Sequence, residues 1–174
     1  MAVQKSLSAM ERLLWTLGIV YREGKHLQIS QQRLFSHAIT VQWVNALEHK
    51  IEDGEQLEAF VSRFGRMQDT VADKLLPRWL VALEERTGSQ IEILNRAEQL
   101  GVLESTEVWL EARKLRNRLI HEYMTDPVSF AEDLNLANRF TTMLLATYQR
   151  LRADIIVRLG VVPEKLPAEL SLLS

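Results

Sequence analysis

The scarcity of turn-forming residues constrains the fold of this chain more than any other feature. Its 174 residues include only seven glycines and four prolines, and two of the prolines, Pro163 and Pro167, stand near the end. So few turns require long elements. Leu, Ala, Glu, Arg and Gln, most of which favour helices, dominate the composition, and no long alternation of apolar and polar residues predicts a strand. The sequence therefore predicts an all-α fold.

Hydrophobic periodicity and capping residues divide the chain into helices joined by short loops. Ser6 or Ser8 is expected to cap the first helix, and Gly24 and Gly54 to end the first and the second. Pro77 should kink the third helix or split it in two. The expected helices cover residues 6–23, 30–53, 55–86, 89–99, about 106–124 and 127–159.

Long helices joined by short loops favour antiparallel neighbours, so we expect an up-down bundle of four or five long helices. Residues 1–160 are predicted to form a single helical domain, because a chain of this length suits one domain. Residues 161–174 are expected to form a loose C-terminal tail, to which the sequence assigns no role. Ser89 and Glu92 have the spacing of a capping box at the start of the short helix 89–99.

Composition excludes several classes of protein. The chain has no cysteine, which excludes a disulfide scaffold, a thiolate metal site and a cysteine nucleophile. Its apolar stretches are far shorter than the ~20 residues of a membrane helix. The opening residues MAVQKSLSAMER lack the apolar block of a secretory signal, so a cytoplasmic protein is expected. The formal net charge of −2 argues against a generic nucleic-acid-coating protein but allows a locally positive cleft.

The expected helix 106–124 departs from simple bundle patterning. At about 100° per residue, its apolar side chains fall in one broad arc, made of Val108, Trp109, Ala112, Leu115, Leu119 and Ile120. Arg116 lies inside that arc, whereas Arg118 falls among the solvated residues of the opposite side. Because arginine is almost never fully buried without a partner, Arg116 needs a carboxylate, a cleft or a ligand anion.

Two polar residues, Asn117 and His121, lie at the border of the same arc. An arginine, an amide and a histidine beside one groove are the groups that cleave a phosphodiester without metal, since histidine moves protons and arginine holds phosphate. Arg116 and His121 are about 140° apart around the helix, so they converge only across a groove, most simply one shared with a second copy. The alternative is that Arg116 pairs with a core acid such as Asp69, while His121 is a satisfied interface histidine.

The segment Arg116-Asn117-Arg118-Leu119-Ile120-His121-Glu122-Tyr123 resembles the signature of HEPN domains, in which an Arg and a polar residue are followed, after a short spacer, by His. It is most similar to the HepT-like subgroup, in which a Tyr follows that His after one residue. The stretch 63–76, RFGRMQDTVADKLL, is similar to the RxxDxxxxK-type helix of HepT-like proteins.

This resemblance implies a helical bundle that dimerises and brings two Arg…His motifs to one cleft. It implies a metal-independent endoribonuclease without a cofactor, in which Arg116, Asn117 and His121 match the catalytic positions. It also implies a toxin paired with a minimal nucleotidyltransferase antitoxin, which adenylylates the motif tyrosine, here Tyr123. Some HEPN proteins lack activity, so the alternative is a non-catalytic helical adaptor or substrate-binding partner of a nucleotidyltransferase.

Two acids on the expected third helix have alternative uses. Asp69 and Asp73 are four residues apart, a spacing that suits a cation or acid–base chemistry. The nearby Arg66 and Lys74 favour ion pairing instead. We expect Asp69 to support the site, as the partner of Arg116.

The motif helix carries a cluster of cations, made of Arg113, Lys114, Arg116 and Arg118. This cluster forms either a solvated basic face or an electrostatic guide for RNA phosphates, and Arg118 is counted with Asp69 as a supporting residue. The histidines outside this helix, His26, His37 and His49, do not form a metal-binding set, and no metal site is predicted.

Assembly into a homodimer is the last expectation. If the apolar arc of the motif helix meets the same arc of a second chain, Arg116 and His121 of both chains meet in one cleft. Trp109 or Ile120 would anchor that interface, since the four tryptophans are expected to be core or interface anchors.

Overall fold

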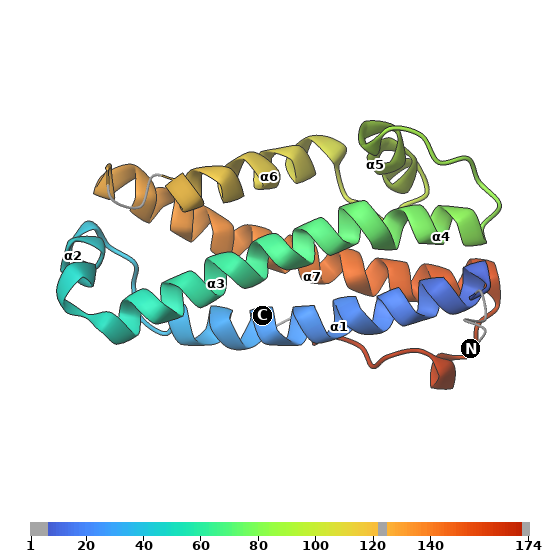
Figure 1. The fold of residues 1–174 in the computed structure, drawn as a ribbon, viewed down its shortest axis with the longest axis horizontal. Helices are drawn as coiled ribbons and strands as arrows, with labels where there is room; N and C mark the ends of the chain where they lie inside the picture. The colour runs from blue at the N-terminus through green and yellow to red at the C-terminus, as the bar shows by residue number, and fades with distance from the viewer. Residues whose placement is uncertain (1–6, 122–124, 172–174) are drawn as a thin grey trace, which may run out of the picture.

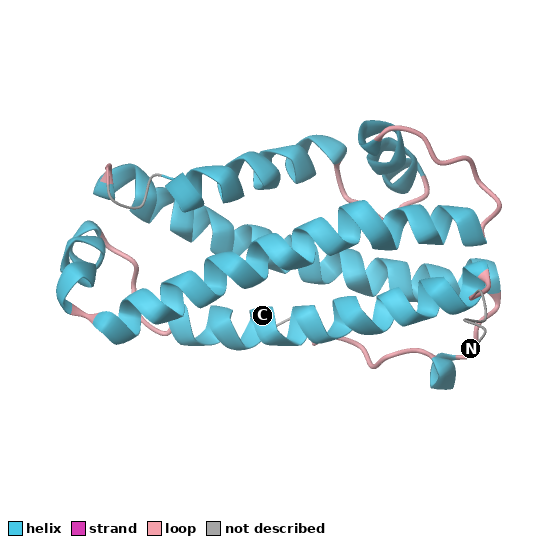
Figure 2. Ribbon diagram, in the orientation of Figure 1, coloured by secondary structure: helices cyan, strands magenta, loops and turns pink. Residues whose placement is uncertain are grey.

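The fold is known from a computed structural model that describes residues 7–121 and 125–171. Within these two ranges every regular element is helical, and the prediction of an all-α fold is confirmed (Figure 2). The long helices lie along one axis and alternate in direction in chain order (Figure 1). They are α1 (Ala9–Leu34), α3 (Ile51–Thr70), α6 (Thr106–His121) and α7 (Pro127–Leu159).

Shorter elements lie at the two ends of these helices (Figure 1). One end carries α2 (Val41–Asn45) and the 3₁₀ turn η1 (Ala46–His49), and the other carries α4 (Leu76–Ala82) and α5 (Gln90–Gln99). A π-helical segment, η2 (Val71–Leu75), joins α3 to α4.

The first helix is longer than predicted, because Gly24 does not end it. Ser8 caps α1 in a reciprocal box with Glu11, and the helix continues to Leu34. Gly24 is buried, and a Cβ at this position would lie 2.6 Å from Cδ1 of Leu170. The glycine therefore makes room for a packed side chain instead of a turn, and packing offsets the helix propensity that glycine lacks.

The predicted helix 30–53 is wrong. Its first residues belong to α1, which ends at Leu34. A new helix, α2, begins after Thr40, whose side chain caps it by accepting a hydrogen bond from the Trp43 amide at 3.1 Å. Gly54 lies inside the first turn of α3. The Thr40 cap thus starts a new helix inside a stretch whose apolar periodicity predicted one continuous helix.

Pro77 acts as the sequence predicted, by interrupting the third helix. The helical path does not stop there, because η2 widens to a π-turn just before α4, where Pro77 occupies the first turn. A widened turn accommodates the proline, which has no amide hydrogen to donate.

The predictions for the helices between residues 89 and 159 are confirmed in the described residues. Ser89 and Glu92 form the expected capping box of α5, and α7 runs from Pro127 to Leu159, after which Gly160 adopts a left-handed φ of 64°. Ser105 accepts a hydrogen bond from the Val108 amide at the start of α6.

The C-terminal segment is not loose in its described part, residues 161–171. Leu170 is buried against α1 beside Gly24. The Tyr148 hydroxyl donates to the Ala168 carbonyl at 2.8 Å, and the Arg152 Nε donates to the Pro167 carbonyl at 2.8 Å. This segment thus links α7 to α1. The η3 turn (Pro163–Lys165) lies near its start.

The core lies between the long helices. Trp79 and Trp109 are fully buried in it, whereas Trp15 on α1 is 58% exposed and is not a core residue. Among the described residues, no helix combines the length and the apolar character needed to cross a membrane.

Candidate functional site

The apolar arc of α6 faces the core of its own chain. Trp109, Ala112, Leu115 and Leu119 are buried there, whereas Ile120 is 52% exposed. The expectation that this arc meets a second chain is therefore wrong for the arc as a whole. Trp109 in particular cannot anchor a dimer, because none of its surface is accessible.

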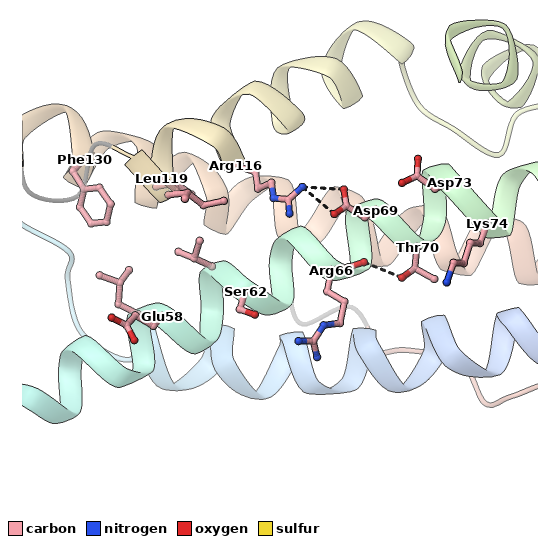
Figure 3. Close-up of a pocket in the computed structure, with 13 residues that line it drawn as sticks. Glu58, Ser62, Arg66, Asp69, Thr70, Asp73, Lys74, Arg116, Leu119 and Phe130 are labelled. Carbon is pink, nitrogen blue, oxygen red and sulfur yellow. Dashed lines mark hydrogen bonds and ion pairs between the residues drawn. The ribbon is translucent and has the colours of Figure 1, made fainter. Parts of the chain in front are cut away.

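Arg116 points from α6 toward α3, where it forms the expected ion pair with Asp69 (Figure 3). Its Nη1 lies 2.9 Å from Oδ2 and 3.0 Å from Oδ1 of that carboxylate. The two side chains keep 29% and 40% of their surface exposed, so the pair is accessible to a ligand.

Gly65 makes this position of Arg116 possible. It lies one turn before Asp69 on α3, and a Cβ added to it would come within 2.6 Å of the Arg116 Nε. Real Cβ atoms almost never approach another heavy atom so closely. The guanidinium therefore rests in space that only glycine leaves open.

Arg116 uses only one of its three guanidinium nitrogens, Nη1, to pair with Asp69. Both contacts to Asp69 are made by Nη1. The Nε is buried without a hydrogen-bond partner, and Nη2 donates to no residue in the described part of the chain. Because arginine recognises phosphate with adjacent N–H groups, Nη2 is free to take one oxygen.

The other two predicted catalytic residues, Asn117 and His121, are exposed on α6. Neither makes a hydrogen bond to another side chain of the described residues, so the expectation that His121 is a satisfied histidine has no support within one chain. Arg116 faces α3 while these two face solvent. One chain thus presents Arg116 on one stripe of the helix and Asn117 with His121 on another, and Tyr123 lies outside the described residues.

A pocket of about 670 Å³ opens beside Arg116, between α3, α6 and the first turn of α7. Figure 3 shows Asp69 and Asp73 pointing toward α6, and Arg66, Thr70 and Lys74 on another side of α3. The pocket is lined by Leu57, Glu58, Val61, Ser62, Arg66, Asp69, Thr70, Asp73, Lys74, Arg116, Leu119, Ile120 and Phe130.

Most of the cations of α6 are neutralised. Arg118 donates through Nε and Nη2 to both carboxylate oxygens of Asp133, at 3.0 and 3.1 Å. Arg113 lies 3.9 Å from Asp73 and donates to Gln90. Three of the four cations of this cluster are thus paired with carboxylates from α3, η2 and α7, whereas Lys114 is exposed and forms no ion pair with a described residue.

Glu23 on α1 adds a half-buried carboxylate behind the pocket. It accepts a hydrogen bond from the Thr70 hydroxyl at 3.0 Å, and its second oxygen is buried without a partner. Burial raises the pKa of Glu23, although the Thr70 hydrogen bond and the charges of Arg66 and Lys74 oppose the rise.

Buried polar atoms without partners also occur on the facing helices α3 and α6. Both amide atoms of Gln68 and the indole Nε1 of Trp109 are buried with no partner among the described residues. A buried polar group without a partner costs about 1–3 kcal/mol.

Sequence reasoning missed the pocket and the role of Gly65. A glycine inside a helix, four residues before an acid, is a readable signal of close approach. The apolar lining left no such signal, because Leu57, Val61 and Phe130 are indistinguishable from core residues until the helices are assembled.

Comparisons with known proteins leave the family of the chain open. No family model, no curated protein and no solved structure matches it.

Proposed function

We propose that this chain is a metal-independent endoribonuclease of the HEPN type, acting as the toxin of a pair with a minimal nucleotidyltransferase antitoxin. The observation that carries the proposal is the state of Arg116: a guanidinium held at a pocket by Asp69, with Nη2 unengaged. Asn117 and His121 are exposed on the same helix, as substrate-contacting residues must be. The all-helical fold is compatible with this assignment.

The reaction needs only these groups. His121 takes the proton of a ribose 2′-OH, and the 2′ oxygen attacks the adjacent phosphorus while the bond from phosphorus to the 5′ oxygen breaks. Arg116 stabilises the charge that develops on the phosphate oxygens, and Asn117 orients the phosphate or His121. The leaving 5′ oxygen takes a proton from water. The products are a 2′,3′-cyclic phosphate end and a 5′-hydroxyl end.

A second copy of the chain completes the site. Arg116 and His121 are about 140° apart on α6, so a two-fold axis beside the helix brings Arg116 of one copy toward His121 of the other. Ile120 and Val128 flank the α6–α7 turn and are 52% and 53% exposed, which favours apolar contact at this end. This interface keeps Ile120, one of the two anchors that the sequence suggested, and leaves out the buried Trp109.

The antitoxin partner is proposed from the resemblance to HepT-like proteins, in which the tyrosine that Tyr123 matches is adenylylated. Tyr123 stands two residues after His121 in the sequence, so adenylylation of its hydroxyl would place a bulky anion beside the reacting groups. The added charge repels the RNA phosphate and blocks the cleft. RNA and the nucleotide donor place this activity in the cytoplasm.

Incubation of the purified protein with single-stranded RNA in EDTA tests the proposal. We expect cleavage with cyclic phosphate ends, lost in His121→Ala and retained in His49→Ala, a matched change at an exposed histidine on η1. Activity that needs a divalent metal, or that survives His121→Ala, contradicts the mechanism. Binding of a nucleotidyltransferase without cleavage, and without growth arrest on expression, would establish the non-catalytic adaptor instead.

A further inference from the structure

The C-terminal segment, residues 161–171, leaves the end of α7 and runs back beside α1 (Figure 1). After the η3 turn its chain is extended, and side chains of the two helices hold its main chain. Gln149 of α7 accepts a hydrogen bond from the Leu170 amide at 2.7 Å. Gln28 of α1 donates to the Ser171 carbonyl at 2.5 Å. The two helices thus contact main-chain atoms of the segment from both sides.

Two further side chains of α7 hold the middle of the segment. The Tyr148 hydroxyl donates to the Ala168 carbonyl, and the Arg152 Nε donates to the Pro167 carbonyl, both at 2.8 Å. Burial raises the pKa of Tyr148, so its hydroxyl remains a donor at neutral pH. Because these bonds are made to main-chain atoms, any peptide that adopts the same extended shape offers the same partners.

Two leucines supply the apolar contact of the segment. Leu166 and Leu170 stand four residues apart and are only 9% and 2% exposed. Gly24 leaves the space for Leu170, since a Cβ there would lie 2.6 Å from the leucine Cδ1. Between the leucines, Glu169 lies 3.7 Å from Arg152 and keeps 71% of its side chain exposed. The contacts therefore select two leucines and favour an acid before the second.

A short, exposed linker connects the segment to α7. Gly160 ends the helix with a left-handed φ of 64°. Val162 is 49% exposed, and residues 163–165 are exposed as well. The segment is thus held by two leucines and by bonds to its main chain, with a linker that adds little to the core. This is the make-up of a peptide ligand that is tethered to its site.

We infer that the surface between α1 and α7 is a docking site for an extended segment of a partner protein, with two leucines four residues apart and an acid before the second. Residues 161–171 occupy this site as a tethered competitor, and their contacts define the chemistry of the partner segment. A tethered segment has an effective concentration of roughly millimolar, so a partner docks only when it outcompetes that segment. The inference uses none of the groups of the proposed reaction.

Cutting the linker tests the inference in the complete chain. A protease site is inserted between Gly160 and Val161, and the purified protein is assayed before and after cleavage. The probe is a fluorescent peptide with the sequence of residues 161–171. After dilution, the cleaved protein should bind the probe roughly hundredfold more tightly than the uncleaved protein, because the competing segment is no longer tethered. Wild-type protein treated with the same protease is the control and should bind like the uncleaved protein.

Changes in the peptide test which of its groups are recognised, and they leave the protein unaltered. Leu170→Ala in the peptide should weaken binding at least about tenfold. A methyl group on the Leu170 nitrogen removes the donor to Gln149 and should weaken binding roughly tenfold. Glu169→Ala should weaken it less than about threefold, because this side chain is mostly exposed.

Gly24→Ala in the cleaved protein tests the other side of the contact. Its Cβ competes with Leu170 for space, so the natural peptide should bind roughly tenfold more weakly. The Leu170→Ala peptide should lose less than about threefold, since its shorter side chain leaves that space open. Gly18→Ala, at a glycine of the same helix with open space around it, is the matched control.

Several results would overturn the inference. One is a cleaved protein that excludes the probe, or that binds it no more tightly than the uncleaved protein. Another is loss of the helical circular dichroism signal when the cleaved protein is diluted, which would make the segment part of the core. Equal binding of the natural and Leu170→Ala peptides would also contradict it. A dimer that dissociates when the linker is cut, measured by light scattering, would assign the surface to a second copy instead of a different partner.

Discussion

Arg116 and Arg118 stand two residues apart on α6, and each pairs with one aspartate, yet the two pairs are built differently. Arg118 donates through Nε and Nη2 to the two oxygens of Asp133, whose side chain is only 16% exposed. Arg116 reaches Asp69 through Nη1 alone, and Asp69 is 40% exposed. The first pair ties α6 to α7 as a structural link. The second pair holds the Arg116 guanidinium at a pocket and leaves its Nη2 without a hydrogen bond to a described residue.

The two ion pairs of this helix are suited to different tasks. A bidentate pair between a donor fork and a shielded carboxylate satisfies both partners and fixes geometry. A one-nitrogen pair at an open pocket fixes the position of the guanidinium while leaving hydrogen-bonding capacity for a ligand. The predictions below test whether these roles are as separate as the contacts indicate.

The largest expected effect is on RNA cleavage. Arg116→Ala should lower the cleavage rate about 100- to 1,000-fold, because it removes the group that stabilises the transition-state charge. Arg118→Ala should change the rate less than threefold in protein shown to be folded. Rates on the same single-stranded RNA check both, and equal losses in the two variants would erase the distinction.

Stability should show the reverse order. Arg118→Ala removes the two N–H groups that Arg118 donates to the shielded Asp133 carboxylate, so the free energy of unfolding should fall by about 1–3 kcal/mol. Arg116→Ala leaves Asp69, which water reaches, and should cost about 1 kcal/mol or less. Urea denaturation measures both values, and a larger loss for Arg116→Ala would show that its pair is the structural one.

Gly65 gives a subtler perturbation of the same site. Gly65→Ala should raise helix propensity by roughly 0.5–1 kcal/mol, but its Cβ displaces the Arg116 guanidinium from Asp69. We expect cleavage to fall roughly tenfold, with stability changed by less than about 1 kcal/mol. Gly54→Ala, at a helical glycine with open space around it, is the control for cleavage and stability alike.

Much of the fold and part of the site could be predicted from the sequence. Caps and periodicity predicted α5 and α7. Because a charged side chain inside an apolar arc needs a partner, the sequence also pointed to Arg116 and to Asp69 as its partner. Gly24 was a misleading signal, because a helical glycine is the same in sequence whether it ends a helix or admits a neighbouring side chain such as Leu170. That choice depends on tertiary packing, which no local pattern records.

The pairing of Arg118 was unpredictable for a related reason. The helical wheel places this residue on the solvated side of α6, but the wheel does not show that α7 passes there with Asp133. The exposed Ile120 is the converse case, since the wheel groups it with residues that the fold buries. Both errors concern the edge of an apolar arc, where neighbouring helices decide exposure.

The smallest expected effect concerns pH. Because burial raises the pKa of Glu23 in the folded state, the folded protein binds that proton more tightly than the unfolded chain does. The cost of burying its charge is therefore present at neutral pH and is relieved as the pH falls through the raised pKa toward 4.5. Glu23→Gln should stabilise the protein relative to wild type at pH 7, and this gain should shrink as the pH approaches 4.5. Urea denaturation across that range checks it, and a gain that grows in acid would contradict the assigned cause.

The central claim, that Arg116 of one copy acts with His121 of another, is tested most directly by a mixed dimer. Arg116→Ala and His121→Ala chains with different affinity tags are co-expressed, and the species carrying both tags is purified. A dimer of this kind holds one intact Arg116–His121 pair and one doubly defective pair, so it should recover about half of the wild-type cleavage rate. Each variant alone should be nearly inactive. A mixed dimer as inactive as its parents would contradict the shared site.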